Sequence, residues 1–190
     1  MSDRLREWRG VLVRVELADR LDRLPAGLRP TGSRSGLRTW EDYVALRSSG
    51  RPASRTSWHF SGWACDVSPS SAATPDVLAA AGLCAPVGGE PWHLEPVVQP
   101  WRGVAGGWRL AIADLGRSAW SRWSDPGAEE RYPAVALAQA YLGLATDGVV
   151  GPRTLAALGG EPWPSTPAGE DELLFRLVPK WNSRNGTGVR

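Results

Sequence analysis

The chain has 190 residues, 42% of them hydrophobic, and a formal net charge of +2 at pH 7. The length fits one medium domain or two small ones, and the composition is ordinary for a folded chain. The balanced charge argues neither for nor against a polyanionic partner, and we expect no nucleic-acid partner. No stretch is long and apolar enough to span a membrane, so we expect no membrane insertion.

The N-terminal part of the chain fits two secondary structures. Apolar side chains recur at helical spacing from Leu5 to Val15, yet Val11 and Val13 also alternate as in a strand. Residues 16–24 favour a helix, and residues 28–33 favour a short strand. Residues 1–10 lack the apolar core of a secretory signal, so we expect a chain that is made in the cytoplasm.

Two further helices have clear start and stop signals. Thr39 is a suitable N-cap for a helix that runs to about Ser48 and stops at Gly50, because its hydroxyl can accept a hydrogen bond from a free backbone N–H. The Thr-Pro pair at 74–75 predicts the start of another helix, which ends at Gly82.

Two short stretches, one before and one after the second of these helices, contain the only two histidines, His59 and His93. Together with Asp66 they are a suitable ligand set for zinc, since two imidazoles and one carboxylate leave a fourth tetrahedral position for water. Glu90, three residues before His93, is placed to take a proton from that water.

Strand alternation predicts how the neighbours of these residues are arranged. Cys65 should point away from the site, and we interpret it as a buried structural thiol; a Cys65–Cys84 disulfide is the less favoured alternative. His93 and Glu95 should share a face, so that Glu95 can orient the imidazole. Gly62 fits a place near the metal that has no room for a side chain.

Tryptophans are concentrated around the two stretches and just beyond them. They are candidates for the walls of a substrate cleft, although core packing is the more common role of such side chains and is favoured for at least two of them. These tryptophans are Trp58, Trp63, Trp92 and Trp101.

The two stretches have the pattern S-x-H-x-x-G-x-A-x-D followed by E-x-W-H-x-E. This pair resembles the zinc D-alanyl-D-alanine carboxypeptidase and endopeptidase family of bacterial and phage cell-wall enzymes, over roughly residues 17–96. The resemblance implies an α+β fold, in which a small antiparallel sheet with flanking helices carries the zinc site, and it implies Glu90 as the general base. The fixed positions are filled by Ser57, His59, Gly62, Ala64, Asp66, Glu90, Trp92, His93 and Glu95.

The resemblance also implies two residues that act on the substrate. The family has an Arg-Ser motif whose arginine holds a substrate carboxylate, and Arg34 is its counterpart here. A guanidinium suits a carboxylate because two parallel hydrogen bonds match its two oxygens. Without the resemblance, Arg34 would be interpreted as a surface residue. Ser57 is expected to help stabilise the oxyanion.

A second resemblance lies in the C-terminal half. Residues 135–154 are similar to the small three-helix peptidoglycan-binding module, with its L-Q helix and its D-G-x-x-G-x-x-T turn. We therefore predict a zinc peptidase domain over 1–100, a helical module over 101–160 that contacts the cell wall, and a linker and C-terminal tail over 161–190, with one or two helical turns near 173–181. A fragment that ends near Pro100 is expected to keep activity on soluble peptides.

The function expected from both resemblances is hydrolysis of peptidoglycan stem peptides by a zinc enzyme, either a carboxypeptidase or an endopeptidase. The absence of a secretory signal favours release of the kind used by phage endolysins. One alternative is a non-catalytic wall-binding or phage structural protein on the same fold. Another is a zinc-bearing signalling domain, since animal Hedgehog proteins share this fold, although the C-terminal module disfavours it.

Overall fold

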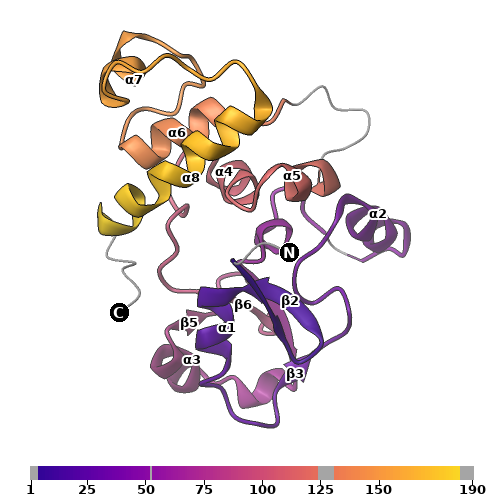
Figure 1. The fold of residues 1–190 in the computed structure, drawn as a ribbon. Coiled ribbons are helices and arrows are strands. Elements are labelled where there is room, and N and C mark those ends of the chain that lie inside the picture. The colour runs from indigo at the N-terminus through magenta and orange to yellow at the C-terminus, as the bar shows by residue number, and fades with distance from the viewer. Residues whose placement is uncertain (1–3, 52, 124–130, 185–190) are drawn as a thin grey trace.

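The computed structural model of the protein describes residues 4–51, 53–123 and 131–184. These residues have the predicted α+β class: two small antiparallel sheets and three helices precede Pro100, and five helices follow it (Figure 1). Within the described residues, no helix combines the length and the apolar character needed to cross a membrane.

The N-terminal residues form a β-hairpin, which settles the choice between helix and strand. Strand β1 (Leu5–Trp8) pairs antiparallel with β2 (Val11–Arg14), and the two-residue turn between them has positive φ at Arg9 and Gly10. Positive φ at both central residues is the turn geometry that matches the twist of paired strands. The alternating side chains, and not the helical spacing, therefore describe this segment.

The second sheet has four short antiparallel strands in the order β3-β4-β6-β5. Its central strands are β4 (Cys65–Ser68) and β6 (His93–Pro96), and its edges are β3 (Arg29–Pro30) and β5 (Leu83–Cys84). The register places Asp66 directly opposite His93. The strand expected over residues 28–33 is thus present but shorter than predicted.

Three helices precede Pro100; the predicted boundaries of the second and third are confirmed, whereas the first ends three residues before the predicted Leu24. Helix α1 spans Val15–Leu21, α2 spans Trp40–Ser48 and α3 spans Pro75–Ala81. Thr39 and Asp42 form a reciprocal capping box at the start of α2. Gly82 ends α3 in the left-handed conformation, which glycine adopts without steric cost.

The five helices after Pro100 differ from the predicted three-helix module. Helices α4 (Gly107–Ala113), α5 (Arg117–Trp123), α6 (Ala134–Leu142) and α7 (Pro152–Ala157) are followed by α8 (Pro167–Arg184). The last helix packs along α6 (Figure 1). The linker expected over 161–172 and the short helical segment expected near 173–181 are therefore corrected: most of this region is one helix. Residues 185–190 of the expected tail lie outside the described residues.

Helix α8 is held in place by apolar packing, which the local sequence did not reveal. Leu173, Leu174 and Leu177 are each at most 6% exposed and belong to one apolar core with residues of α4 and α6. Trp101 stacks on Trp181 with ring centroids 4.9 Å apart. Burial of these three leucines stabilises α8. The full length of the helix was not predicted, because its first turns are rich in polar residues.

The turn between α6 and α7 is organised by one buried glutamine. The Gln139 side-chain amide donates to Asp147 Oδ1 at 2.7 Å and to the Val149 carbonyl at 3.0 Å, with Thr154 Oγ1 at 3.1 Å. Its carbonyl oxygen accepts from the Gly148 N–H at 2.9 Å. The L-Q helix and the D-G-x-x-G-x-x-T pattern thus describe one hydrogen-bonded unit.

The residues before and after Pro100 share an apolar core. Phe60 and Trp63, which come from the first histidine stretch, are nearly fully buried in the same cluster as α4, α5, α6 and α8. Phe60 meets Trp123 edge to face, with ring centroids 6.0 Å apart. The helices therefore cover the back of the segment that carries His59.

A buried charge cluster also joins the two halves. Arg14, only 2% exposed, donates to Asp114 Oδ2 at 2.6 Å, to the Ala111 carbonyl at 2.6 Å and to the Ser61 carbonyl at 3.0 Å. Arg4 and Tyr141 donate to the other oxygen of Asp114. The N-terminal hairpin is thus fixed to the end of α4 by hydrogen-bonded charges.

Candidate metal centre

Three separate elements bring His59, Asp66 and His93 together. His59 lies on a short 3-10 helix (Trp58–Ser61), Asp66 on β4 and His93 on β6. The side chains of all three are at least 88% buried. Antiparallel register explains the Asp66–His93 pair, and the 3-10 helix turns His59 toward them.

The local sequence around His59 shapes this turn. Ser57 Oγ accepts a hydrogen bond from the His59 backbone N–H at 3.3 Å and so caps the 3-10 helix. Gly62 ends it with φ of 71°, and a Cβ there would lie 3.1 Å from the backbone nitrogen of Arg14. Our expectation that Gly62 makes room for the metal is therefore corrected, because the glycine is required by a left-handed turn packed against the hairpin.

The three donor atoms form a nearly equilateral triangle. His59 Nε2 and His93 Nδ1 are 3.2 Å apart, and each lies 3.1 Å from Asp66 Oδ1. Bond lengths of about 2.0–2.1 Å at a tetrahedral zinc place its ligand atoms roughly 3.3 Å apart. The triangle therefore fits one face of a zinc tetrahedron with almost no rearrangement, and the group has the composition of a metal site.

Hydrogen bonds on the outer side of each histidine fix which ring nitrogen faces the centre. His59 Nδ1 is 2.9 Å from the Gly36 carbonyl oxygen. A carbonyl can only accept, so Nδ1 carries the proton and the lone pair of the neutral ring is on Nε2. His93 Nε2 is 3.0 Å from Glu95 Oε1, which leaves Nδ1 to face the centre. The predicted position of Glu95 behind His93 is confirmed.

The carboxylates are held in the same manner. Glu95 also accepts from Gln99 Nε2 at 3.3 Å and from Arg102. Asp66 Oδ2 accepts from Arg38 Nη2 at 2.5 Å, so Oδ1 is left for the centre. Arg38 was not predicted, since it lies 28 residues before Asp66 in an arginine-rich segment with no local signal.

Burial and hydrogen bonds shift the pKa values of all three residues. Burial lowers the pKa of His59, whose outer partner is a neutral carbonyl. Burial acts the same way on His93, but its hydrogen bonds to Asp66 and Glu95 outweigh it and raise the pKa to about 9. For Asp66, burial is outweighed by hydrogen bonds from both histidines, which hold its pKa below the ordinary range. The two histidines differ in their partners, because His93 lies between two carboxylates, whereas His59 has Asp66 on one side and a neutral carbonyl on the other.

The cluster opens into a pocket of about 950 Å³, and the other predicted residues line it. Glu90 is half-buried on its wall, at the end of the loop before β6. Arg34 also lines the pocket, but its Nε donates to Asp42 Oδ1 at 3.1 Å and its side chain is 49% exposed. Ser57 lines it beside His59. The structure thus gathers all six predicted residues around one cavity, and their roles remain predictions.

The tryptophans and cysteines are now placed. Trp58 and Trp92 line the pocket, whereas Trp63 and Trp101 are buried in the core, as expected for at least two of the four. Cys65 is a fully buried free thiol, and burial raises its pKa far above the ordinary value. Cys84 is free as well, so the alternative disulfide is not formed.

Comparisons with family models, with curated proteins and with solved structures found no match to this chain. Both family resemblances therefore remain predictions. What the structure adds is independent of them: two imidazoles and one carboxylate converge at the pocket, close enough together to hold a metal ion.

Proposed function

We propose that this chain is a zinc-dependent peptidase that hydrolyses peptidoglycan stem peptides. The observation that carries the proposal is the triangle formed by His59 Nε2, His93 Nδ1 and Asp66 Oδ1, in a pocket that Glu90 also lines. Three such atoms held 3.1–3.2 Å apart, with their outer hydrogen bonds already made, repel one another unless a proton or a metal cation lies between them. A zinc ion can take the place of that proton, because its ligand atoms have nearly this spacing.

The donor set favours zinc among the common metal ions. Imidazole and carboxylate ligands in a tetrahedral arrangement with one open position are typical of catalytic zinc, whereas calcium and magnesium select oxygen ligands. The chemistry that a bound zinc ion supplies is activation of water and polarisation of the scissile carbonyl.

Residues of the chain would carry out proton transfer, oxyanion stabilisation and substrate positioning. Glu90 takes the proton of the attacking water and delivers it to the leaving amine. The Ser57 hydroxyl, whose lone pair is used in capping His59, has its proton free to stabilise the developing oxyanion. Arg34 lies on the wall of the same pocket, where its guanidinium can position a substrate carboxylate.

The substrate class rests on the paired motifs of the two histidine stretches. Their resemblance to cell-wall peptidases points to stem peptides, and the C-terminal helices are proposed to contact the cell wall. Both carboxypeptidase and endopeptidase activity are compatible with this metal centre. Action on the wall after release of the endolysin kind is part of the same proposal.

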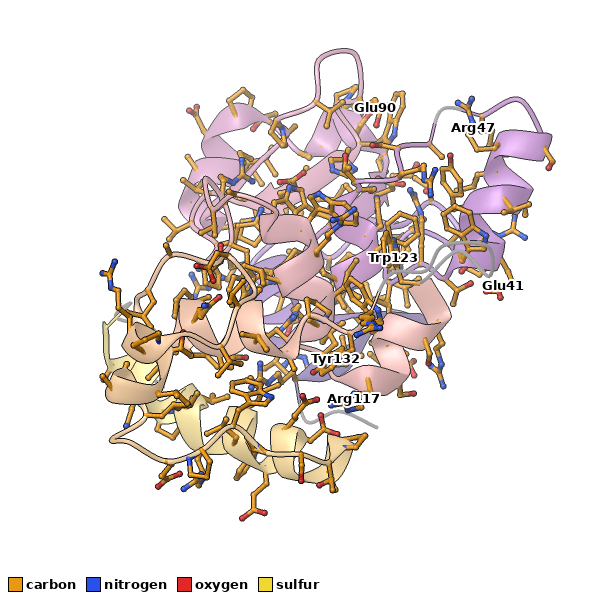
Figure 2. The ribbon with its side chains drawn as sticks, turned by 90° about the horizontal axis from the view of Figure 1, so that it is seen from above. Glu41, Arg47, Glu90, Arg117, Trp123 and Tyr132 are labelled. Carbon is orange, nitrogen blue, oxygen red and sulfur yellow. The ribbon has the colours of Figure 1, made fainter. Side chains whose placement is uncertain are left out.

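The test is Glu90→Gln, because glutamine is nearly isosteric but cannot take the proton. Zinc content and hydrolysis of a soluble stem peptide are measured on the same preparation. We expect full zinc with a loss of rate of roughly a hundred- to ten-thousand-fold. Glu41→Gln is the matched control, since Glu41 is an exposed residue of α2 outside the pocket and well separated from Glu90 (Figure 2).

The other outcomes are equally informative. Full zinc with near-normal turnover would exclude Glu90 as the base, and loss of zinc would make Glu90 a ligand. A wild-type protein that holds zinc but cuts no stem peptide would favour the non-catalytic alternative. A wild-type protein that neither contains nor binds zinc would remove the basis of the proposal.

A further inference from the structure

We propose that Arg47 and Arg51 form a carboxylate-binding subsite on the wall of the metal pocket, which holds an acidic group of the peptide at a distance from the bond that is cut. This inference rests on the proposed function and specifies its substrate: a peptide with a free carboxylate beyond its scissile bond. Both arginines line the same pocket as His59, Asp66 and His93.

The backbone at the end of α2 fixes where the two arginines lie. Arg47 is in the last turn of the helix, and Gly50 follows with φ of 74°. The Gly50 N–H donates to the Arg47 carbonyl and the Arg51 N–H to the Leu46 carbonyl, both at 3.1 Å. This hydrogen-bonded end of the helix presents two guanidiniums, four residues apart, from one ordered turn.

The charges along the pocket are unbalanced in favour of cations. Five arginines line it, against three acidic residues. Three of the arginines are satisfied: Arg38 by Asp66, Arg102 by Glu95, and Arg34 by Asp42 outside the pocket. Within residues 4–51, 53–123 and 131–184, the side chains of Arg47 and Arg51 have neither an ion-pair partner nor a hydrogen-bond partner. The excess positive charge is therefore located on these two.

Two exposed guanidiniums beside a pocket are suited to a carboxylate, which takes charge-assisted hydrogen bonds from both. Figure 2 shows Arg47 on α2 and Glu90 on the loop before β6 near the same edge of the molecule, on separate elements. The pocket is lined both by His59, Asp66 and His93 and by the end of α2, so one bound peptide can contact both.

A purely structural role is the competing explanation, because cations near a helix C-terminus are stabilised by the helix dipole. The two roles differ in what they change. A structural role alters the unfolding temperature, whereas a subsite alters the affinity for one form of the peptide and leaves its uncharged analogue unaffected.

The experiment uses two synthetic stem pentapeptides that differ only in one carboxylate upstream of the terminal residues, free in one and amidated in the other. Binding is measured by calorimetry on zinc-loaded Glu90→Gln, so that neither peptide is consumed, and again with Arg47→Gln and Arg51→Gln added. Arg153→Gln, an exposed arginine of α7 outside the pocket, is the matched control.

We expect the free carboxylate to improve affinity by roughly tenfold, a preference that disappears with the two substitutions and persists in the control. The preference should also weaken as salt is raised. Equal affinity for both peptides, a preference that survives both substitutions, or failure to bind either peptide would overturn the subsite. Turnover by the wild type reports on the proposed function separately, since a protein that cuts both peptides equally keeps that function and loses only this inference.

Discussion

At the scale of single residues, the centre is defined as much by outer hydrogen bonds as by the three ligands. The carbonyl of Gly36 selects the ring nitrogen of His59, and Glu95 selects that of His93. Arg38 orients Asp66 through a 2.5 Å hydrogen bond. Outer hydrogen-bond partners of this kind orient metal ligands before a metal binds. Removing such a partner therefore lowers the affinity for the metal.

Arg38 provides the test at this scale. We expect Arg38→Gln to weaken zinc affinity by roughly ten- to a hundredfold, because Asp66 loses the partner that orients it. The measurement is competition for zinc against a chromophoric chelator. Arg153→Gln serves again as the control for the removal of one positive charge. An unchanged zinc affinity in Arg38→Gln would show that the strand alone is enough to position Asp66.

At the scale of elements, the N-terminal hairpin and α4 are joined by Asp114 and its arginines. Arg14 makes three hydrogen bonds, to three different residues, from a position with 2% exposure. One of them goes to the carbonyl of Ser61, which lies on the 3-10 helix of His59. The cluster therefore supports the metal centre from behind without contributing a ligand.

Removal of this carboxylate charge should be costly. Asp114→Asn leaves Arg14 as a buried charge without a counter-ion, and losses of about 3–5 kcal/mol in the free energy of unfolding are typical of such changes. Chemical denaturation at pH 7 measures the loss. A change below about 0.5 kcal/mol, as is usual for surface substitutions, would mean that the cluster adds no stability.

The same substitution gives a pH dependence with a definite sign. Burial would raise the pKa of Asp114, but the charges of Arg14 and Arg4 outweigh it and hold that pKa below its ordinary value. A depressed pKa contributes stability that is present above the unfolded-state pKa, about 3.9, and is lost as the pH falls below it. The difference in unfolding free energy between wild type and Asp114→Asn should therefore decrease as the pH is lowered from about 5 toward the folded-state pKa of Asp114.

At the scale of the whole molecule, the half that contains the candidate metal centre and the helical half share one apolar core. Phe60 and Trp63 lie under α4 and α5, close in sequence to His59. Arg14 finds its counter-ion beyond Pro100. The sequence alone led us to expect a fragment of residues 1–100 to keep its activity, whereas the shared core gives a physical reason to expect otherwise.

The truncation itself decides between these expectations. We predict that a fragment of residues 1–100 fails to fold, because it exposes two large aromatic side chains and leaves Arg14 without Asp114. Amide resonance dispersion and zinc binding are the measurements, with the full chain as control. A fragment with dispersed resonances and full zinc affinity would show that residues 1–100 fold alone and that the helices act only in targeting.

Features that depend on neighbouring residues could be predicted from the amino-acid sequence. The capping box at Thr39, the left-handed end of α3 at Gly82 and the strand faces of His93 and Glu95 each follow from local backbone geometry. The convergence of His59, Asp66 and His93 could also be predicted, because these three residues fill fixed positions of the two motifs.

Features that depend on distant residues could not be predicted from the sequence and were seen first in the folded chain. Arg38 behind Asp66, Asp114 behind Arg14 and the burial of α8 against α6 join positions 25 or more residues apart, and no local pattern encodes such pairs. The N-terminal segment likewise forms a hairpin in spite of its helical spacing, because the strand conformation buries Trp8, Val11 and Val13 in the apolar core. Short-range hydrogen bonds can be inferred from residue types. Burial of a side chain depends instead on which distant segments of the chain pack against it.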